Sequence, residues 1–328
     1  MHLNHLDKYP DLADGICHGM TCWDNRQVRV ARWPALSSAP KGTICLLHGR
    51  AEFIEKYYEV IRELRQRGFA VATMDWRGQG LSDRQAGHPL KGDVRHFSDY
   101  GKDLIQFIRE IILPDCPPPC FALTHSMGGL ILLSNLPQMR IKIDRAVLCA
   151  PLIALSTSRY SFLGHTPSQS GIRKLTALMR YLGQGERYAP GVSRTPFDRQ
   201  GFYNNHVTSD GPRYDRNRQF LIDYPDLAIA GPTIRWLHEN CKAMERLHSS
   251  DFQSSIYTPT LIVTAGNDEV VDSRAAELFA LTTRAAGAVS IAGSRHEIMM
   301  EREIIREQFW AAFDSFIPGE NALQPSGN

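Results

Sequence analysis

The segment 124–129, Thr-His-Ser-Met-Gly-Gly, lies between an apolar run, residues 120–123, and a run of helix-forming residues, 130–136. This order predicts a strand that turns sharply into a helix and presents Ser126 at the bend, as in the nucleophile elbow of a hydrolase. The usual pattern is Gly-x-Ser-x-Gly, and here Thr124 stands in place of the first glycine. A serine that begins an ordinary strand-to-helix turn is the alternative, so the hypothesis needs support from the rest of the chain.

A serine nucleophile needs a base to take its proton and a carboxylate to orient that base. In open α/β sheets both come from loops at the carboxyl ends of strands. Asp268 is the first carboxylate after the apolar strand 261–264, whereas the loop after the strand 145–150 offers no acid. His296 lies in the last loop before the final helix. The order Ser126, Asp268, His296 is that of α/β-hydrolases, so we predict these residues as the catalytic triad.

Two backbone N–H groups should stabilise the oxyanion. One is predicted at Met127, the residue after the nucleophile, and the other in the loop that follows the strand 43–47. That loop begins His-Gly-Arg-Ala, so we predict the N–H of Arg50 as the second donor, with Ala51 as the alternative.

Apolar strands alternate with helical segments along most of the chain, which predicts an α/β protein with a mostly parallel sheet covered by helices on both faces. The expected strands are residues 43–47, 69–76, 120–123, 145–150, 260–265 and 288–291, preceded by a hairpin at 19–33. The expected helices are 52–66, 99–113, 130–136, 273–283 and 301–316. Together with the order of the candidate residues, this pattern predicts an α/β-hydrolase fold.

The alternation stops between residues 152 and 248, a stretch rich in Arg, Tyr, Pro, Ser and Gly with helices expected only at 172–182 and 233–247. A segment of this length inside an α/β pattern predicts an inserted helical lid. We therefore expect a core of residues 1–151 and 249–328, and a cap of residues 152–248. Apolar residues in and beside the cap could line an acyl pocket or pack the cap onto the core; they are Leu152, Ile153, Leu155, Phe162, Leu163, Leu175, Leu178, Met179, Leu182, Trp236 and Leu237.

The amino-acid composition argues against several classes of function for this chain: nucleic-acid binding, membrane spanning and metal binding. Lys and Arg total 37 against 35 Asp and Glu, so the charge balance gives no reason to expect nucleic acid as a partner. Neither a secretory signal nor an apolar stretch of membrane-spanning length is visible, which predicts a cytoplasmic protein with at most peripheral membrane contact. The seven cysteines lack the spacing of a zinc site, and a serine triad needs no cofactor, so we expect neither metal nor cofactor.

Several motifs lie along the chain: His48-Gly49, the segment Asp75 to Asp83, His125 to Gly129, Asn267-Asp268 and Gly293 to Glu297. Together they resemble those of the monoacylglycerol lipase and lysophospholipase L2-like family of α/β-hydrolases. The resemblance covers nearly the whole predicted core and weakens in the predicted cap. Thr124 is the clearest departure within the core, and it affects the expected geometry of the elbow rather than the identity of the nucleophile.

The resemblance implies a serine carboxylic-ester hydrolase that acts on lysophospholipids or monoacylglycerols through an acyl-enzyme on Ser126. An amidase like a proline iminopeptidase remains an alternative, because acids in the predicted cap could bind a free amine. Those acids are Glu186, Asp198, Asp210, Asp215, Asp223 and Asp226. A binding protein on an inactive hydrolase scaffold is a third alternative, which the complete set of triad residues disfavours. The substrate-binding residues and the oligomeric state do not follow from the sequence.

Overall fold

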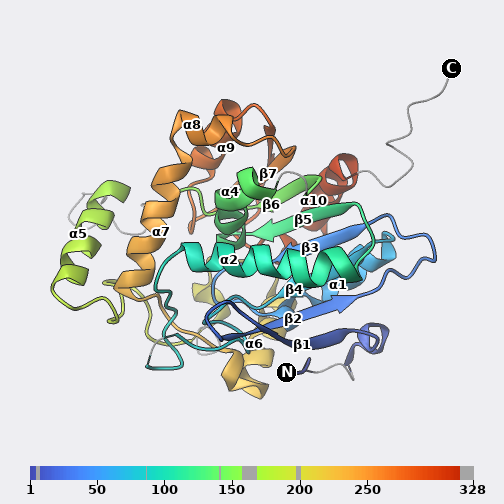
Figure 1. Cartoon of the computed structure of the whole chain (residues 1–328), viewed down its shortest axis with the longest axis horizontal. Helices are drawn as coiled ribbons and strands as arrows, with labels where there is room; N and C mark the ends of the chain where they lie inside the picture. Colours follow the sequence, from blue (N-terminus) through green and yellow to red (C-terminus); the bar gives the residue numbers. More distant parts are fainter. Residues whose placement is uncertain (5–7, 86, 140–141, 157–167, 197–200, 318–328) are drawn as a thin grey trace.

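The computed structural model describes residues 1–4, 8–85, 87–139, 142–156, 168–196 and 201–317 (Figure 1). Within these ranges the eight strands form one sheet in the order β1-β2-β4-β3-β5-β6-β7-β8. The strands are β1 (Ile16–Thr21), β2 (Gln27–Trp33), β3 (Thr43–Leu47), β4 (Ala70–Met74), β5 (Cys120–His125), β6 (Arg145–Cys149), β7 (Thr260–Ala265) and β8 (Ala286–Ile291). The pairs β1–β2 and β2–β4 are antiparallel, and every other pair is parallel. The predicted mostly parallel sheet is confirmed.

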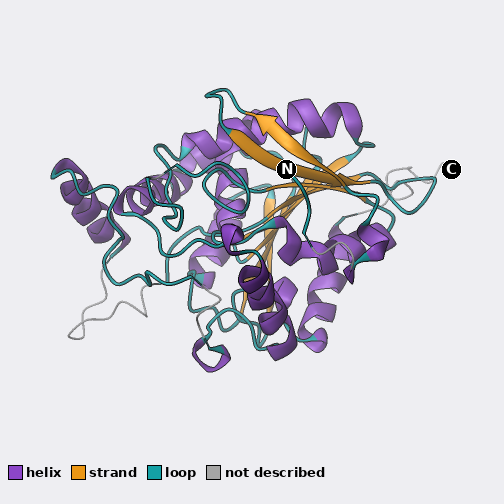
Figure 2. Ribbon diagram, turned by 90° about the horizontal axis from the view of Figure 1, so that it is seen from below, coloured by secondary structure: helices purple, strands orange, loops and turns teal. Residues whose placement is uncertain are grey.

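Helices lie on both sides of this sheet, as Figure 2 shows. The core helices are α1 (Tyr58–Gln66), α2 (Ser98–Phe107), α3 (Leu113–Asp115), α4 (Met127–Met139), α9 (Ser273–Thr282) and α10 (Glu303–Phe316). Short 3-10 turns occupy Pro10–Leu12, Ile54–Tyr57 and Ile298–Met300, and Ile108–Ile112 form a π-helical turn. The central strands β3, β4 and β5 are buried along their whole length, because helices cover both of their faces.

The segment between β6 and β7, residues 150–259, is called the insertion below. Its described part holds α5 (Gln169–Tyr181), α6 (Gly211–Asp223), α7 (Ile234–Leu247), α8 (Ser250–Ser254) and the 3-10 turns Phe202–Asn204 and Pro225–Leu227. In Figure 1, α5 stands at the outer edge of the molecule beside α7. Helix α6 packs against the turn Ile54–Tyr57 and the start of α1, where Phe220 contacts Phe53 and Tyr58. The predicted cap, residues 152–248, falls within the insertion, and its boundaries stay a prediction.

The sequence interpretation missed α6. Its signals are an aspartate and a proline at its start and buried residues at helical spacing. The Asp210 side chain accepts a hydrogen bond of 2.7 Å from the Arg213 backbone N–H, and Tyr214, Asn217 and Leu221 are buried. Many charged residues between these positions make the helical spacing of the buried residues hard to recognise in the sequence.

The other predicted helices are present with shifted ends. The expected helix 52–66 begins as a 3-10 turn at Ile54, and the last helix begins at Glu303 rather than residue 301. No helix of the described residues has the length and apolar character needed to cross a bilayer.

A buried arginine joins the second strand to the core. Arg29 on β2 bonds Glu55 at 2.7 Å and Asp75 at 2.7 Å, and all three side chains are inaccessible to solvent. Burial acts to raise the pKa of the Asp75 carboxyl, but the charge of Arg29 and the nearby His48 imidazole, 3.5 Å away, lower it to about 2. The antiparallel edge of the sheet is therefore fixed to the loop after β4 and to the turn before α1 by one cation.

We expect Arg29→Met to lower the free energy of unfolding by about 3–5 kcal/mol, because it leaves two carboxylates buried without their cation. Arg32 on the same strand is a matched control, since its contact with Asp115 is 3.1 Å long and partly exposed. Arg32→Met should cost less than about 1 kcal/mol. Urea unfolding of both variants measures the difference, and equal losses would contradict the interpretation.

Candidate active site

Loops at the carboxyl ends of β5, β7 and β8 bring the three predicted triad residues into contact. His296 Nε2 lies 3.0 Å from the Ser126 hydroxyl oxygen, and His296 Nδ1 lies 2.8 Å from a carboxylate oxygen of Asp268. Ser126 and His296 are only 7% and 4% exposed. The arrangement can pass a proton from the serine to an imidazole that is oriented by a carboxylate.

The loop after β7 keeps Asp268 ionised and oriented. One of its carboxylate oxygens accepts the backbone N–H groups of Val270 at 2.8 Å and Val271 at 3.0 Å, and the other faces His296. Burial acts to raise the pKa of Asp268, but the charge and hydrogen bond of His296 and these two N–H groups lower it. An ionised carboxylate on Nδ1 favours the imidazole form whose Nε2 can accept the serine proton.

Ser126 occupies a strained turn. Its φ of 49° lies in the left-handed region, and its backbone N–H bonds the carbonyl of Cys149 at 3.0 Å. A Cβ on Gly128 would lie 2.5 Å from the carbonyl oxygen of Leu47 and 2.7 Å from that of His48. Glycine is required at 128, because backbone atoms of the neighbouring strand and loop approach it so closely.

Thr124 fits the elbow because Gly129 leaves space for it. Its side chain is fully buried in β5, and its Oγ1 lies 3.2 Å from the position that a Cβ on Gly129 would take. Among the described residues this hydroxyl has no hydrogen-bond partner. The threonine therefore fills space beside the second glycine and leaves the Ser126–His296 contact intact.

The segments that carry the predicted oxyanion donors lie beside the serine. A Cβ on Gly49 would lie 3.2 Å from Ser126 Cβ, so the loop carrying Arg50 runs beside the nucleophile, and Met127 is the first residue of α4. The backbone N–H of Ala51 donates to Gln79 Oε1 at 2.7 Å. This bond occupies the N–H of the alternative donor, and the oxyanion roles remain predictions.

The Arg50 side chain reaches into the insertion. Its Nη2 bonds the carbonyl of Ala230, and its guanidinium lies 5.2 Å from the centre of the Trp236 ring. The residue predicted to supply an oxyanion donor thus also joins the oxyanion loop to the insertion.

A buried ionic network beside the oxyanion loop was not predicted from the sequence. Lys56 Nζ lies 2.7 Å from Glu52 and 2.6 Å from Glu297, the residue after His296. Glu52 also accepts the backbone N–H of Gly49 and a bond of 2.8 Å from the Tyr57 hydroxyl. The network therefore connects the oxyanion loop with the loop that carries the base. In the sequence, Glu52 and Lys56 look like an ordinary i,i+4 pair on an exposed helix.

His125 extends this network to the nucleophile. Its Nδ1 lies 3.1 Å from Glu52, and its Nε2 lies 3.2 Å from the carbonyl oxygen of His296. Burial acts to lower the pKa of His125, but the charge of Glu52 raises it above the usual value. Both ring nitrogens face acceptors, which a protonated imidazole satisfies.

Burial also disfavours the charged forms of Glu52 and Lys56, but the opposite charges beside them outweigh this effect. The charges of Lys56 and His125 hold the pKa of Glu52 well below its usual value, and those of Glu297 and Glu52 raise the pKa of Lys56. Glu52 and Lys56 are therefore both held in their charged forms near neutral pH.

A cavity of about 540 Å³ lies between the oxyanion loop and the insertion. Its lining comprises Arg50, Ala51, Glu52, Phe53, Lys56, Gly191, Val192, Ser193, Thr195, Val207, Asn217, Leu221, Ile229, Ala230, Gly231, Pro232 and Glu297. The lining reaches the sequence neighbours of groups at the site, since Arg50 follows Gly49, which lies beside Ser126, and Glu297 follows His296. The cavity can therefore receive part of a substrate.

None of the described apolar residues considered for an acyl pocket is among those lining this cavity. Leu152, Ile153 and Trp236 are buried in the core, whereas Leu175 and Leu178 are exposed. Phe162 and Leu163 lie outside the described residues. The apolar part of the lining comes instead from residues such as Phe53, Val192 and Leu221, which the sequence did not single out.

The family model described as serine aminopeptidase, S33, matches residues 38–303. The chain belongs to this family. Its sequence is 31% identical over 312 residues to lysophospholipase L2 of Escherichia coli strain K12, covering 93% of this chain and 87% of that protein. It is 28% identical over 280 residues to the probable lysophospholipase L2 of Haemophilus influenzae, covering 85% of each chain. The predicted membership in the lysophospholipase L2-like α/β-hydrolases, and the predicted enzyme class of serine hydrolase, are confirmed.

Solved structures agree on the fold. A monoglyceride lipase from Saccharomyces cerevisiae, determined with a substrate analogue, superposes with a TM-score of 0.69 at 19% identity, covering 92% of this chain and 94% of that one. A carboxyl esterase from Bacillus coagulans superposes with a TM-score of 0.71 at 18% identity, covering 93% and 99%. The predicted α/β-hydrolase fold is confirmed.

The two sides of the elbow should respond differently to substitution. Thr124→Val replaces a buried hydroxyl that lacks a partner, so the free energy of unfolding should stay equal or rise by up to about 1 kcal/mol. Gly128→Ala should unfold more readily and lose most ester hydrolysis, because its Cβ meets backbone carbonyls. Urea unfolding and hydrolysis of a soluble ester measure both effects, and a strongly destabilised Thr124→Val protein would refute this account of Thr124.

Glu52→Gln should reduce kcat by roughly 10-fold to 100-fold, because a small displacement of the oxyanion loop misplaces its donors. The amide keeps the shape of the side chain but cannot accept from Gly49, Tyr57 and Lys56 together. Steady-state hydrolysis of a soluble ester tests this. Glu110→Gln is the control, because the Glu110 side chain is 41% exposed and bonds Gln106 and Arg109 on its own helical segment. Equal kcat values in the two variants would argue against the role of Glu52.

Proposed function

We propose that the chain is a carboxylic-ester hydrolase of lysophospholipids or monoacylglycerols that acts through an acyl-enzyme on Ser126. The observation that carries this proposal is the hydrogen-bonded series from Ser126 through His296 to Asp268. In the first step Ser126 Oγ attacks the ester carbonyl while His296 Nε2 takes its proton. The tetrahedral oxyanion is held by the N–H groups of Arg50 and Met127, and collapse expels the alcohol, which receives the proton from His296.

The second half of the reaction frees the acyl group. His296 takes a proton from water, the resulting hydroxide attacks the acyl-enzyme carbonyl, and Ser126 leaves with the returned proton. Asp268 stays ionised and stabilises the imidazolium in both halves. These steps are complete with groups of the chain and water.

The substrate class rests on the relatives and the cavity. The proteins named lysophospholipase L2 align with this chain over most of their length, and a monoglyceride lipase shares its fold. Apolar side chains such as Phe53, Val192 and Leu221 share the lining with the charged Lys56 and Glu297. A lining of this mixed kind suits a substrate with both an acyl chain and a polar group.

An amidase that binds a free amine would need a carboxylate facing the substrate. None of the described acids of the insertion is among the cavity's lining residues, and Asp198 lies outside the described part of the chain. The lining carboxylates, Glu52 and Glu297, are already bonded to Lys56. These observations favour the ester over the amide, although the family description names an aminopeptidase.

Peripheral contact with a membrane belongs to the same proposal. Leu175 and Leu178 on α5, and Leu182 just after it, are each more than half exposed and recur at helical spacing. An exposed apolar surface of this kind would let the protein contact a membrane that contains its lipid substrate. The cytoplasmic location stays a prediction.

Turnover of lysophosphatidylcholine, a monoacylglycerol and a prolyl amide by the wild-type protein and by Ser126→Ala tests the proposal. We expect hydrolysis of one or both lipid esters, its loss in Ser126→Ala, and a fall in kcat of about 10⁴ in Asp268→Asn, where the imidazole takes the wrong tautomer. Turnover that persists in Ser126→Ala would contradict the acyl-enzyme mechanism on Ser126. A preference for the prolyl amide would support the amidase alternative.

A further inference from the structure

The loop that carries the base, residues 292–301, has little regular structure of its own. It contains one 3-10 turn, Ile298–Met300, after His296. On its core side it is held by His125, which bonds the carbonyl of His296 at 3.2 Å, and by Lys56, which bonds Glu297 at 2.6 Å. A base acts only within hydrogen-bond reach of its proton, so whatever else holds this loop bears on catalysis.

A segment of the insertion, residues 205–210, lies along the other side of this loop. The backbone N–H of Glu297 bonds the carbonyl of Val207 at 2.7 Å, and Thr208 Oγ1 bonds the carbonyl of Met300 at 2.7 Å. The Arg295 guanidinium donates to the carbonyl of Thr208 at 3.0 Å. The contacts flank His296 on both sides in the sequence, and Val207 also lines the cavity.

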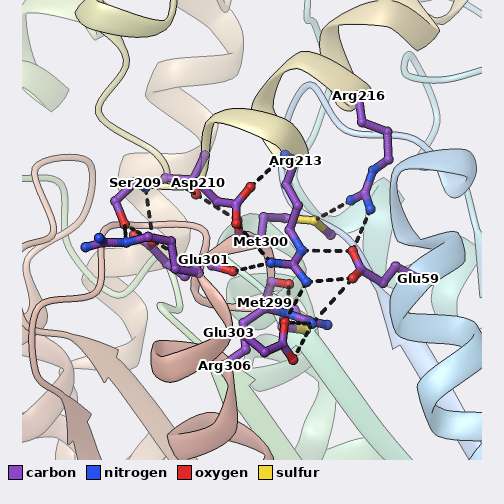
Figure 3. A network of polar contacts seen from close by, with 12 residues as sticks. Glu59, Ser209, Asp210, Arg213, Arg216, Met299, Met300, Glu301, Glu303 and Arg306 are labelled. Carbon is purple, nitrogen blue, oxygen red and sulfur yellow. Dashed lines mark hydrogen bonds and ion pairs between the residues drawn. The ribbon is translucent and has the colours of Figure 1, made fainter.

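Glu301 joins the two segments through a fully buried carboxylate. One oxygen accepts the backbone N–H of Arg295 at 2.9 Å, and the other accepts the backbone N–H of Ser209 at 3.0 Å and its hydroxyl. Figure 3 shows Ser209 and Glu301 facing each other. A buried carboxylate is stable only while its donors stay in place, so the residue before His296 and the insertion are held at fixed positions.

Arg213, in the first turn of α6, ties this junction to the core (Figure 3). Its Nε and Nη2 bond the two carboxylate oxygens of Glu59 on α1 at 2.9 and 2.7 Å, and its Nη1 bonds the carbonyl of Glu301 at 2.9 Å. Burial acts to raise the pKa of Glu59, but the hydrogen bond of Arg213 and the charge of Arg216 lower it to about 2. The planar guanidinium thus holds the core, α6 and the end of the base loop in one geometry.

We propose that Arg213 and Glu301 are positioning residues that hold the insertion against the base loop and so keep His296 Nε2 within reach of Ser126. The inference rests on the proposed role of His296 as the base. The insertion thereby contributes to the alignment of the base as well as to the wall of the cavity.

Arg213→Met keeps the length of the side chain and removes the guanidinium. With p-nitrophenyl butyrate, a small ester, kcat should fall about 10-fold or more while KM changes less than about threefold. A residue that only shaped the cavity wall would instead raise KM and leave kcat unchanged, which would overturn the proposal. Arg180→Met is the matched control, because Arg180 bonds Glu239 at 2.9 Å within the insertion and touches neither the cavity lining nor the base loop.

Hydrogen exchange of residues 293–301 gives a readout that does not depend on hydrolysis. Their amides should exchange faster in Arg213→Met than in the wild-type protein or Arg180→Met, because the loop opens locally. Unchanged exchange overturns the proposal even if the protein is an ester hydrolase, whereas activity that survives Ser126→Ala would overturn the proposed function alone. If Arg213→Met fails to fold by circular dichroism, Ser209→Ala carries the same test, since it removes only the hydroxyl bonded to Glu301.

Discussion

The left-handed backbone of Ser126 is the constraint on which the site depends. A non-glycine residue adopts this conformation only when its surroundings leave it no other. Here the bond from Ser126 to Cys149 fixes the turn to β6, and the close approach of Gly128 to Leu47 fixes it to β3. The three strands are therefore held in register at the point where the nucleophile emerges. The loops after β7 and β8 bring Asp268 and His296 to that point.

Buried charges, rather than regular secondary structure, join the loops of the site to one another. Lys56 links the oxyanion loop to the base loop, and Arg213 links the base loop to the insertion and to α1. Such pairs add little net stability, because removing charges from water is unfavourable, but they are specific in geometry. Ionic contacts of this kind can hold the residues of an irregular loop in position as firmly as a helix would.

The parts of the site that follow from the sequence are those tied to strand ends. Ser126, Asp268 and His296 could be found because each is a reactive residue within a few positions of the end of an apolar run, and the structure brings them into contact. Lys56 and Glu52 could not be recognised, because a charged pair four residues apart is common on solvated helices, and only the tertiary contact with Glu297 reveals their burial. Arg213 stayed hidden for a similar reason, since its partners lie far away in the sequence on α1 and in the base loop.

The threonine in the elbow bears on how such a motif can change over time. A Cβ at position 129 would lie 2.8 Å from the side chain of Pro151, so glycine is required there whatever residue occupies position 124. The space that this glycine leaves open is the space that Thr124 uses. With Gly129 in place, the first glycine of the motif can therefore be replaced by threonine without a compensating change in the helix. A search for nucleophile elbows that insists on that first glycine will pass over lineages in which a second glycine of this kind is present.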